Sequence, residues 1–195
     1  VLSVTAGSDA VAGNYEIFVQ QLAQNHQMSL SFNSTDTLPA DGQFELTVAG
    51  ESFAVDLSAL PANAGLTDLA SAINNAADNS GVQATVMRSG TQSYLVLTSK
   101  ESGAANAISM NFVPGADTSG ADIGAAVTAA TELKAAQDAI VKVGAQNPIT
   151  VTSASNKLED VIAGVTIDLK KMQAGTDQPV QISVQPVSYT HLRAH

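Results

Sequence analysis

The stretch QFELTVAGESFAVDL, Gln43 to Leu57, decides the fold of the central part of the chain. Its apolar residues alternate with other residues on both sides of a turn: Phe44, Leu46 and Val48 before it, and Phe53, Val55 and Leu57 after it. A two-residue period is that of a pleated strand with one buried face. The stretch therefore predicts a β-hairpin that turns at Ala49-Gly50-Glu51.

A helix and a second pair of strands are predicted directly after this hairpin. In GLTDLASAINNAADNSG, residues 65–81, one helical face carries Leu66, Leu69, Ile73 and Ala77. Thr67 or Asp68 is expected to cap the start, and Gly81 lies beyond the end. Alternating strands follow at Val82 to Val86 and at Tyr94 to Leu97, around a turn at Ser89-Gly90. Residues 43–99 therefore read as strand, strand, helix, strand, strand.

The same order is predicted a second time near the end of the chain, as an internal repeat. AIVKVGAQNPITV predicts a hairpin around residues 144–148, and NKLEDVI predicts a short helix in which Asn156 caps and Glu159 reaches back. GVTIDLK and PVQISVQ then supply two strands. The expected fold class is α+β and predominantly β.

A strand pattern also opens the stretch GNYEIFVQQLAQNHQM, Gly13 to Met28, but it fades after Val19 into a polar run. We interpret this run as a strand that leaves the sheet through a bulge, with polar side chains that meet solvent or a neighbouring domain. A second interpretation places them in a subunit contact. His26 is the only histidine before the last five residues. A catalytic triad would need a serine and a carboxylate beside it, and the chain has no G-x-S-x-G turn, so we expect an ordinary polar residue.

Two regions with weaker secondary-structure patterns lie between these units. Ser31 to Gly42 is turn-rich and is interpreted as a crossing between domains. From Gly103 to about Ala130 the chain is rich in Ala, Gly, Asp and Thr, where GAANAISMNF predicts an edge strand and ADIGAAVTAATELKAAQ a weak helix.

Composition limits the function. The 195 residues are 45% hydrophobic and only 4% aromatic, which predicts a core with few large aromatic side chains. A net charge of −10 argues against nucleic acid and against an anionic membrane surface, because both need clustered Lys and Arg. The absence of cysteine removes disulfides, thiolate metal sites and cysteine nucleophiles. It suits a protein exported unfolded, and the cytoplasm explains it as well.

The two ends of the chain differ from the rest. The first residues read as mid-chain sequence without a signal peptide, so we expect a fragment. Residues 187–195 hold two of the three histidines and are expected to be a non-native tail that resembles translated cloning sequence. A native, disordered basic end is the alternative.

Three stretches, in order, resemble the FliD family of bacterial flagellar filament cap proteins. AGNYEIFVQQLAQNHQM is similar to the entry to that family's head region, and residues 44–99 resemble its flagellin hook-IN element. AQDAIVKVGAQNPITVTSASNKLEDVIAGVTIDLK is similar to the segment by which the chain returns to the first head domain. The resemblance covers about residues 5 to 185.

The resemblance implies a discontinuous arrangement. Residues 1–35 and 131–186 would form one β-rich head domain, and residues 36–130 a second domain inserted into it, each with a strand-strand-helix-strand-strand unit. It also implies an extracellular place at the flagellum tip, a ring of several copies as homo-oligomer, and flagellin as partner. The family's helical leg is absent here, so this piece should lack much of the capping activity.

No catalytic, cofactor-binding or metal-binding residue is expected. Asp117 and Asp122 suggest calcium, but their spacing fits no calcium loop, and a solvated loop is favoured. Asn33-Ser34-Thr35 has the form of a glycosylation acceptor, which means little in a bacterial protein.

Two other functions stay open, and neither is an enzyme. One is another flagellar axial protein with a hook-IN domain, such as a flagellin. The other is an extracellular adhesin or carbohydrate-binding β module. Some cap proteins are also linked to host adhesion, so a host surface ligand is compatible with capping.

Overall fold

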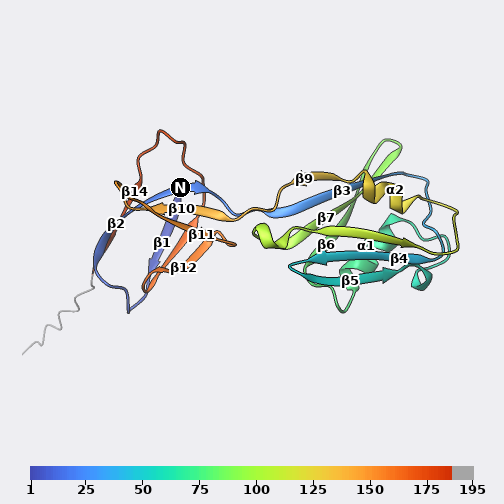
Figure 1. The fold of residues 1–195 in the computed structure, drawn as a ribbon, viewed down its shortest axis with the longest axis horizontal. Coiled ribbons are helices and arrows are strands. Elements are labelled where there is room, and N and C mark those ends of the chain that lie inside the picture. Colours follow the sequence, from blue (N-terminus) through green and yellow to red (C-terminus); the bar gives the residue numbers. More distant parts are fainter. Residues whose placement is uncertain (186–195) are drawn as a thin grey trace, which may run out of the picture. The chain divides into compact units, whose positions relative to one another are not determined.

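The computed structural model describes residues 1–185. These residues form two compact units, and the chain passes between them twice. Unit 1 combines Val1–Ala23 with the chain from Asp138 onward, and unit 2 is the continuous segment Gln24–Gln137. Both are built mainly from antiparallel strands (Figure 1), which confirms the predicted β-rich α+β class. The expected foreign tail, 187–195, lies outside the described residues.

Unit 2 contains two sheets with a shared core. Its elements are β3 (Asn25–Asn33), β4 (Gly42–Val48), β5 (Glu51–Asp56), η1 (Leu57–Ala59), α1 (Leu66–Asn75), β6 (Val82–Ser89), β7 (Gln92–Ser102), η2 (Ala104–Asn106), β8 (Ser109–Pro114), α2 (Ile123–Thr128) and β9 (Thr131–Lys134). The strand orders are β6-β7-β3-β9 and β5-β4-β8. The core residues of both sheets and of the two α-helices belong to one cluster.

The predicted hairpin and edge strand of unit 2 are confirmed. In the hairpin β4–β5, Val48 pairs with Glu51, so the connection is the two-residue turn Ala49-Gly50. Both turn residues have positive φ, 52° and 80°, as a type I′ turn requires. The predicted edge strand is β8, which pairs with β4.

Helix α1 packs mainly against β6, with further contacts to β5 and β7 (Figure 1). Its N-cap is Gly65, two residues before Thr67 and three before Asp68, the two predicted caps. Asp68 instead accepts a hydrogen bond from the Gly65 N–H (2.8 Å). Leu66, Leu69 and Ile73 are buried as expected. The helix ends at Asn75, so Ala77 lies past it and is exposed.

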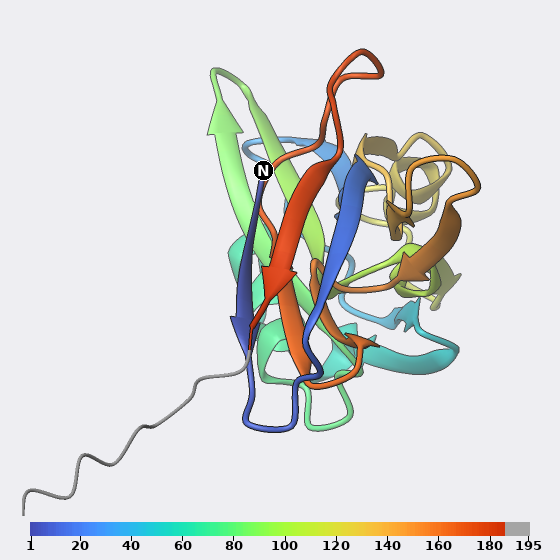
Figure 2. The same ribbon diagram turned by 90° about the vertical axis from the view of Figure 1, so that its left-hand side faces the viewer.

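Unit 1 consists of two sheets around its own core. Its strands are β1 (Leu2–Ala6), β2 (Gly13–Gln21), β10 (Ala139–Val143), β11 (Ile149–Ser153), β12 (Lys157–Ile162), β13 (Val165–Leu169) and β14 (Val180–Val184). They form the orders β1-β13-β12 and β11-β10-β2-β14. Strands distant in sequence lie side by side: in Figure 2 the red β14 runs beside the blue β2. The predicted hairpin at residues 144–148 is confirmed as β10–β11.

The predicted short helix at residues 156–162 is wrong, because this segment is the strand β12. Leu158 pairs with Ile167 of β13 and is buried, whereas Asp160 has a positive φ of 55° within a register shift. A segment this short does not repay the cost of helix nucleation, and the neighbouring strand offers it hydrogen bonds instead. The second repeat therefore lacks the helix of the first.

The structure also moves the expected boundaries between units. Residues 24–35 were expected in the outer part of the chain, but Asn25–Asn33 forms β3, which pairs with β7 inside unit 2. Thr131–Lys134 pairs with the other side of β3. The crossings therefore lie at 23/24 and 137/138 rather than at 35/36 and 130/131. The turn-rich segment 31–42 is a connection within unit 2, where the Leu38 N–H donates to the Ala64 carbonyl (2.8 Å).

Side-chain amides act as substitutes for peptide groups beside three strand segments. The buried Gln173 side-chain oxygen accepts from the Val19 N–H, and the Gln173 backbone N–H donates to the Val19 carbonyl, both at 2.9 Å. In unit 2, Asn74 of α1 donates to and accepts from the backbone of Ala84, both at 2.8 Å. Asn156 does the same for Ala23. These amides form hydrogen bonds with backbone N–H and C=O groups that the neighbouring strands do not bond.

Candidate functional site

His26 is the ionisable residue of the polar run, and it is buried at 5% exposure. The sequence predicted an ordinary polar residue at a strand end, meeting solvent or a neighbouring domain, but His26 is buried inside unit 2. Strand β2 ends at Gln21, and a separate strand, β3, begins at Asn25. His26 shares a face of β3 with Leu30 and Phe32, which are core residues. The expected irregularity exists, because the pairing of β3 with β7 shifts register between Asn25 and Gln27.

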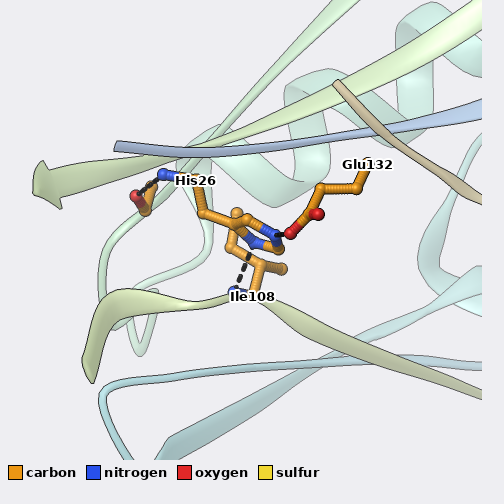
Figure 3. A network of polar contacts seen from close by, with 4 residues as sticks. His26, Ile108 and Glu132 are labelled. Carbon is orange, nitrogen blue, oxygen red and sulfur yellow. Dashed lines mark hydrogen bonds and ion pairs between the residues drawn. The ribbon is translucent and has the colours of Figure 1, made fainter. Parts of the chain in front are cut away.

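Two hydrogen bonds fix the state of the His26 ring (Figure 3). Its Nδ1 atom accepts from the Ile108 N–H at 2.8 Å, so Nδ1 carries no proton. The proton of the neutral ring therefore lies on Nε2, which donates to Glu132 Oε1 at 2.9 Å. The ring joins β3 to β9 and to the segment before β8. We conclude that His26 has a structural role and links three segments of unit 2.

The surroundings of His26 do not form a nucleophilic triad. Ser99 lies nearby, but its hydroxyl accepts from the His26 backbone N–H (2.8 Å) and donates to the Glu101 carbonyl (2.8 Å). A general base must contact the nucleophile through its ring nitrogen. Both ring nitrogens of His26 have other partners.

The point where the chain enters and leaves unit 2 is held by backbone hydrogen bonds. The Gln24 N–H donates to the Gln137 carbonyl (2.9 Å), and the Gln137 N–H donates back to Gln24 (3.3 Å). The Gln24 carbonyl also accepts from Gly103 (3.2 Å). Asn25 extends this contact, because its side chain donates to the Ser99 carbonyl (2.8 Å). The polar run therefore joins the two ends of unit 2 by hydrogen bonds.

The acidic loop residues order their own backbone. Asp117 accepts from the Ala40 N–H (2.6 Å) and the Ser119 N–H (2.9 Å), and these bonds hold the pKa of Asp117 below its ordinary value of 3.8. Asp122 caps α2 by accepting from the Ala125 N–H (2.9 Å). Within residues 1–185, no group of three or more His, Asp or Glu side chains is arranged to hold a metal ion. The Asn33 side chain donates to Asp36 in a turn.

Across the same residues, no helix has the length and apolarity that a membrane crossing requires. Charge is unevenly divided between the units. Unit 2 contains eleven acidic and three basic residues, whereas residues 1–23 and 138–185 contain seven and four. A surface of this kind repels nucleic acid phosphates.

Comparison with known proteins gives a consistent result. A family model for the flagellin hook IN motif matches residues 43–101. The lateral flagellar hook-associated protein 2 of Vibrio parahaemolyticus is 35% identical over 191 residues. The D2-D3 domains of the flagellar cap protein FliD from Serratia marcescens match 94% of this chain and 99% of that chain, with 26% identity and a TM-score of 0.73. This chain belongs to the FliD family.

The FliD structure from Pseudomonas aeruginosa matches 96% of this chain and 85% of that chain, with a TM-score of 0.81 and 24% identity, which shows a common fold. The alignment with the Vibrio relative covers 93% of this chain and 42% of the relative. This chain therefore spans about two fifths of the relative's length and corresponds to the D2-D3 part of FliD. The family resemblance and the hook-IN element, expected from the sequence, are confirmed.

Proposed function

We propose that this chain is the D2-D3 part of a flagellar filament cap, which sits outside the cell at the filament tip and promotes the assembly of flagellin. The observation that carries the proposal is the near-complete match to the D2-D3 domains of a protein described as a flagellar cap protein. An adhesin or a flagellin with a hook-IN domain would account for residues 43–101 but not for the match over 94% of the chain.

The proposed mechanism is structural and uses no catalytic residue. Two buried polar side chains, His26 and Gln173, bind backbone groups of the protein itself, and His26 also contacts Glu132. The two units act as two domains, with the second inserted into the first at 23/24 and 137/138. The partners are further copies of the cap protein and flagellin.

The location of the protein tests this function. The turn at Gly90 is exposed, and no atom lies within 4 Å of a Cβ placed there, so an epitope inserted after Gly90 should not disturb the fold. We expect immunogold labelling of cells that carry the tagged full-length gene to mark filament tips. Label along the filament would instead identify an axial filament subunit, and label on the cell body an adhesin. The same insertion at Gly50, in the exposed turn of β4–β5, is a matched second position.

A further inference from the structure

The four-stranded sheet of unit 1 has two edge strands of similar character. Strands β11 and β14 are the outer members of the order β11-β10-β2-β14. Each has five residues, ITVTS and VQISV, without charge, proline or glycine. Ile149 of β11 is 68% exposed. Edges of this composition are templates for pairing with another strand.

Three other edge strands of residues 1–185 carry charged side chains, which disfavour pairing with another strand. Strand β9 carries Glu132 and Lys134, and β12 carries Lys157 and Glu159 together with a register shift. β5 carries Glu51 and Asp56. Strand β1 is uncharged, but the opposite edge of its sheet is β12. The sheet with β11 and β14 is therefore the one in unit 1 whose two edges match.

Hydrogen-bond alternation shows which backbone groups face the open edges. The Gly144 N–H donates to the Glu16 carbonyl (2.8 Å), so the backbone N–H and C=O groups of Glu16 face β10. The backbone groups of its neighbours Tyr15 and Ile17 therefore face β14. With the register of the sheet, this places the N–H and C=O groups of Gln181 and Ser183 on the side of β14 where no strand of residues 1–185 pairs with it. The same alternation places those of Thr150 and Thr152 on the free side of β11.

We propose that β11 of one copy pairs with β14 of a second copy, in a head-to-tail contact between cap subunits. The contact pairs Thr150 with Ser183 of the second copy, Thr152 with Gln181, and Val151 with Ile182. Hydroxyl and amide side chains then meet on the outer face, and apolar side chains meet on the core face. A shift by one residue would place threonine opposite isoleucine.

Strand direction fits this contact. Each neighbouring pair in the sheet is antiparallel, so the two edge strands of a four-stranded sheet run in opposite directions. Adding β14 of a second copy to β11 therefore continues the antiparallel order while both copies keep the same orientation. A heterologous contact of this kind closes into a ring if the rotation between copies allows it. The inference rests on the self-assembly in the proposed function and names the surface for it.

Engineered cysteines test the pairing, because the chain has none of its own. Within one molecule β11 and β14 are separated by three strand spacings, about 14 Å, which is too far for a disulfide. We expect the double variant T150C/S183C to form disulfide-linked dimers and longer chains on oxidation, and the single variants to form about tenfold less. Equal dimer formation by T150C alone would overturn the proposal, because β11 would then meet its own copy.

A second pair of variants tests the contact without cross-linking. Thr152→Pro removes an N–H from the open edge but none from the β10 pairing, whereas Thr152→Val keeps it. We expect Thr152→Pro to weaken self-association, measured by light scattering on the full chain, by about tenfold or more. Thr152→Val should not change it. If Thr152→Pro assembles as the parent does and T150C/S183C stays monomeric, the edge contact is refuted, while tip labelling still decides the cap function separately.

Discussion

Asn156 binds the backbone of Ala23 in both directions: the Ala23 N–H donates to its Oδ1 at 2.7 Å, and its Nδ2 donates to the Ala23 carbonyl at 2.9 Å. Ala23 is the last residue of unit 1 before the chain enters unit 2. A side chain 133 residues away therefore fixes the end of the first segment. The sequence had suggested a helix cap for Asn156, which the strand β12 replaces.

Asn156→Asp should destabilise the protein by about 1–3 kcal/mol, because the carboxylate cannot donate to the Ala23 carbonyl and faces it with negative charge. Urea unfolding followed by circular dichroism measures the loss. Asn147→Asp, the same change in the exposed loop of the β10–β11 hairpin, is the control and should stay within about 0.5 kcal/mol of the parent. Similar losses for both would refute the role of Asn156.

The His26 ring should be found as the Nε2–H tautomer, because Nδ1 accepts from Ile108. Long-range ¹H–¹⁵N NMR spectra at neutral pH distinguish the two tautomers, and a proton on Nδ1 would contradict this hydrogen bond.

The two partners in the same contact should contribute unequally to stability. His26→Ala is expected to cost about 1–3 kcal/mol, since it leaves the Ile108 N–H without its acceptor. The Glu132 side chain is 55% exposed, so Glu132→Ala should cost less than about 1 kcal/mol. Urea unfolding of both variants gives the comparison, and a larger loss for Glu132→Ala would show that the hydrogen bond to Glu132, rather than the Ile108 bond, holds the ring.

Ala49 has a backbone conformation, φ 52°, that favours asparagine or glycine. Ala49→Asn should raise the free energy of unfolding by about 0.5–1 kcal/mol, because asparagine tolerates the left-handed region better than alanine. Gly50→Ala, one residue later at φ 80°, is expected to act in the opposite direction. Thermal unfolding of the two variants provides the measurement, and destabilisation by Ala49→Asn would contradict the type I′ turn.

Asp117 should contribute to the acid sensitivity of unit 2. Its hydrogen bonds from Ala40 and Ser119 lower its pKa in the folded protein, so its contribution to stability is present above the unfolded value near 3.8 and is lost as the pH falls through the lower folded value. NMR titration of the Asp117 carboxyl should show the lowered pKa. Asp117→Asn should flatten the acid limb of stability against pH, and an unchanged limb would show that the loop is not held by this carboxylate.

Alternation predicted the hairpins well because both of their strands are neighbours in sequence. It could equally have found β3, since His26, Met28, Leu30 and Phe32 alternate along one face. That pattern was missed because a histidine and flanking amides disguise its start as a polar run. Placing β3 in unit 2 depends on its pairing with β7, about 70 residues away, and local sequence does not report such a partner.

The error at β12 has a different physical origin. Asn156, Glu159 and their spacing satisfy the rule for a helix start, yet the outcome depends on β13 being at hand to pair. The hydrogen bonds of Asn156 and Gln173 to distant backbone were likewise beyond sequence reasoning, because an amide side chain is equally compatible with a solvated loop.

The reciprocal hydrogen bonds between Gln24 and Gln137 have a consequence for the order of folding. Strands β2 and β10 of unit 1 pair across roughly 120 intervening residues, and closing so long a loop in an unfolded chain is slow and entropically costly. Once Gln24–Gln137 has folded, its two ends are adjacent and the loop is already closed. Folding of unit 2 therefore brings β2 and β10 close together before they pair. Mutations in the core of unit 2 should then slow the folding of unit 1 as well.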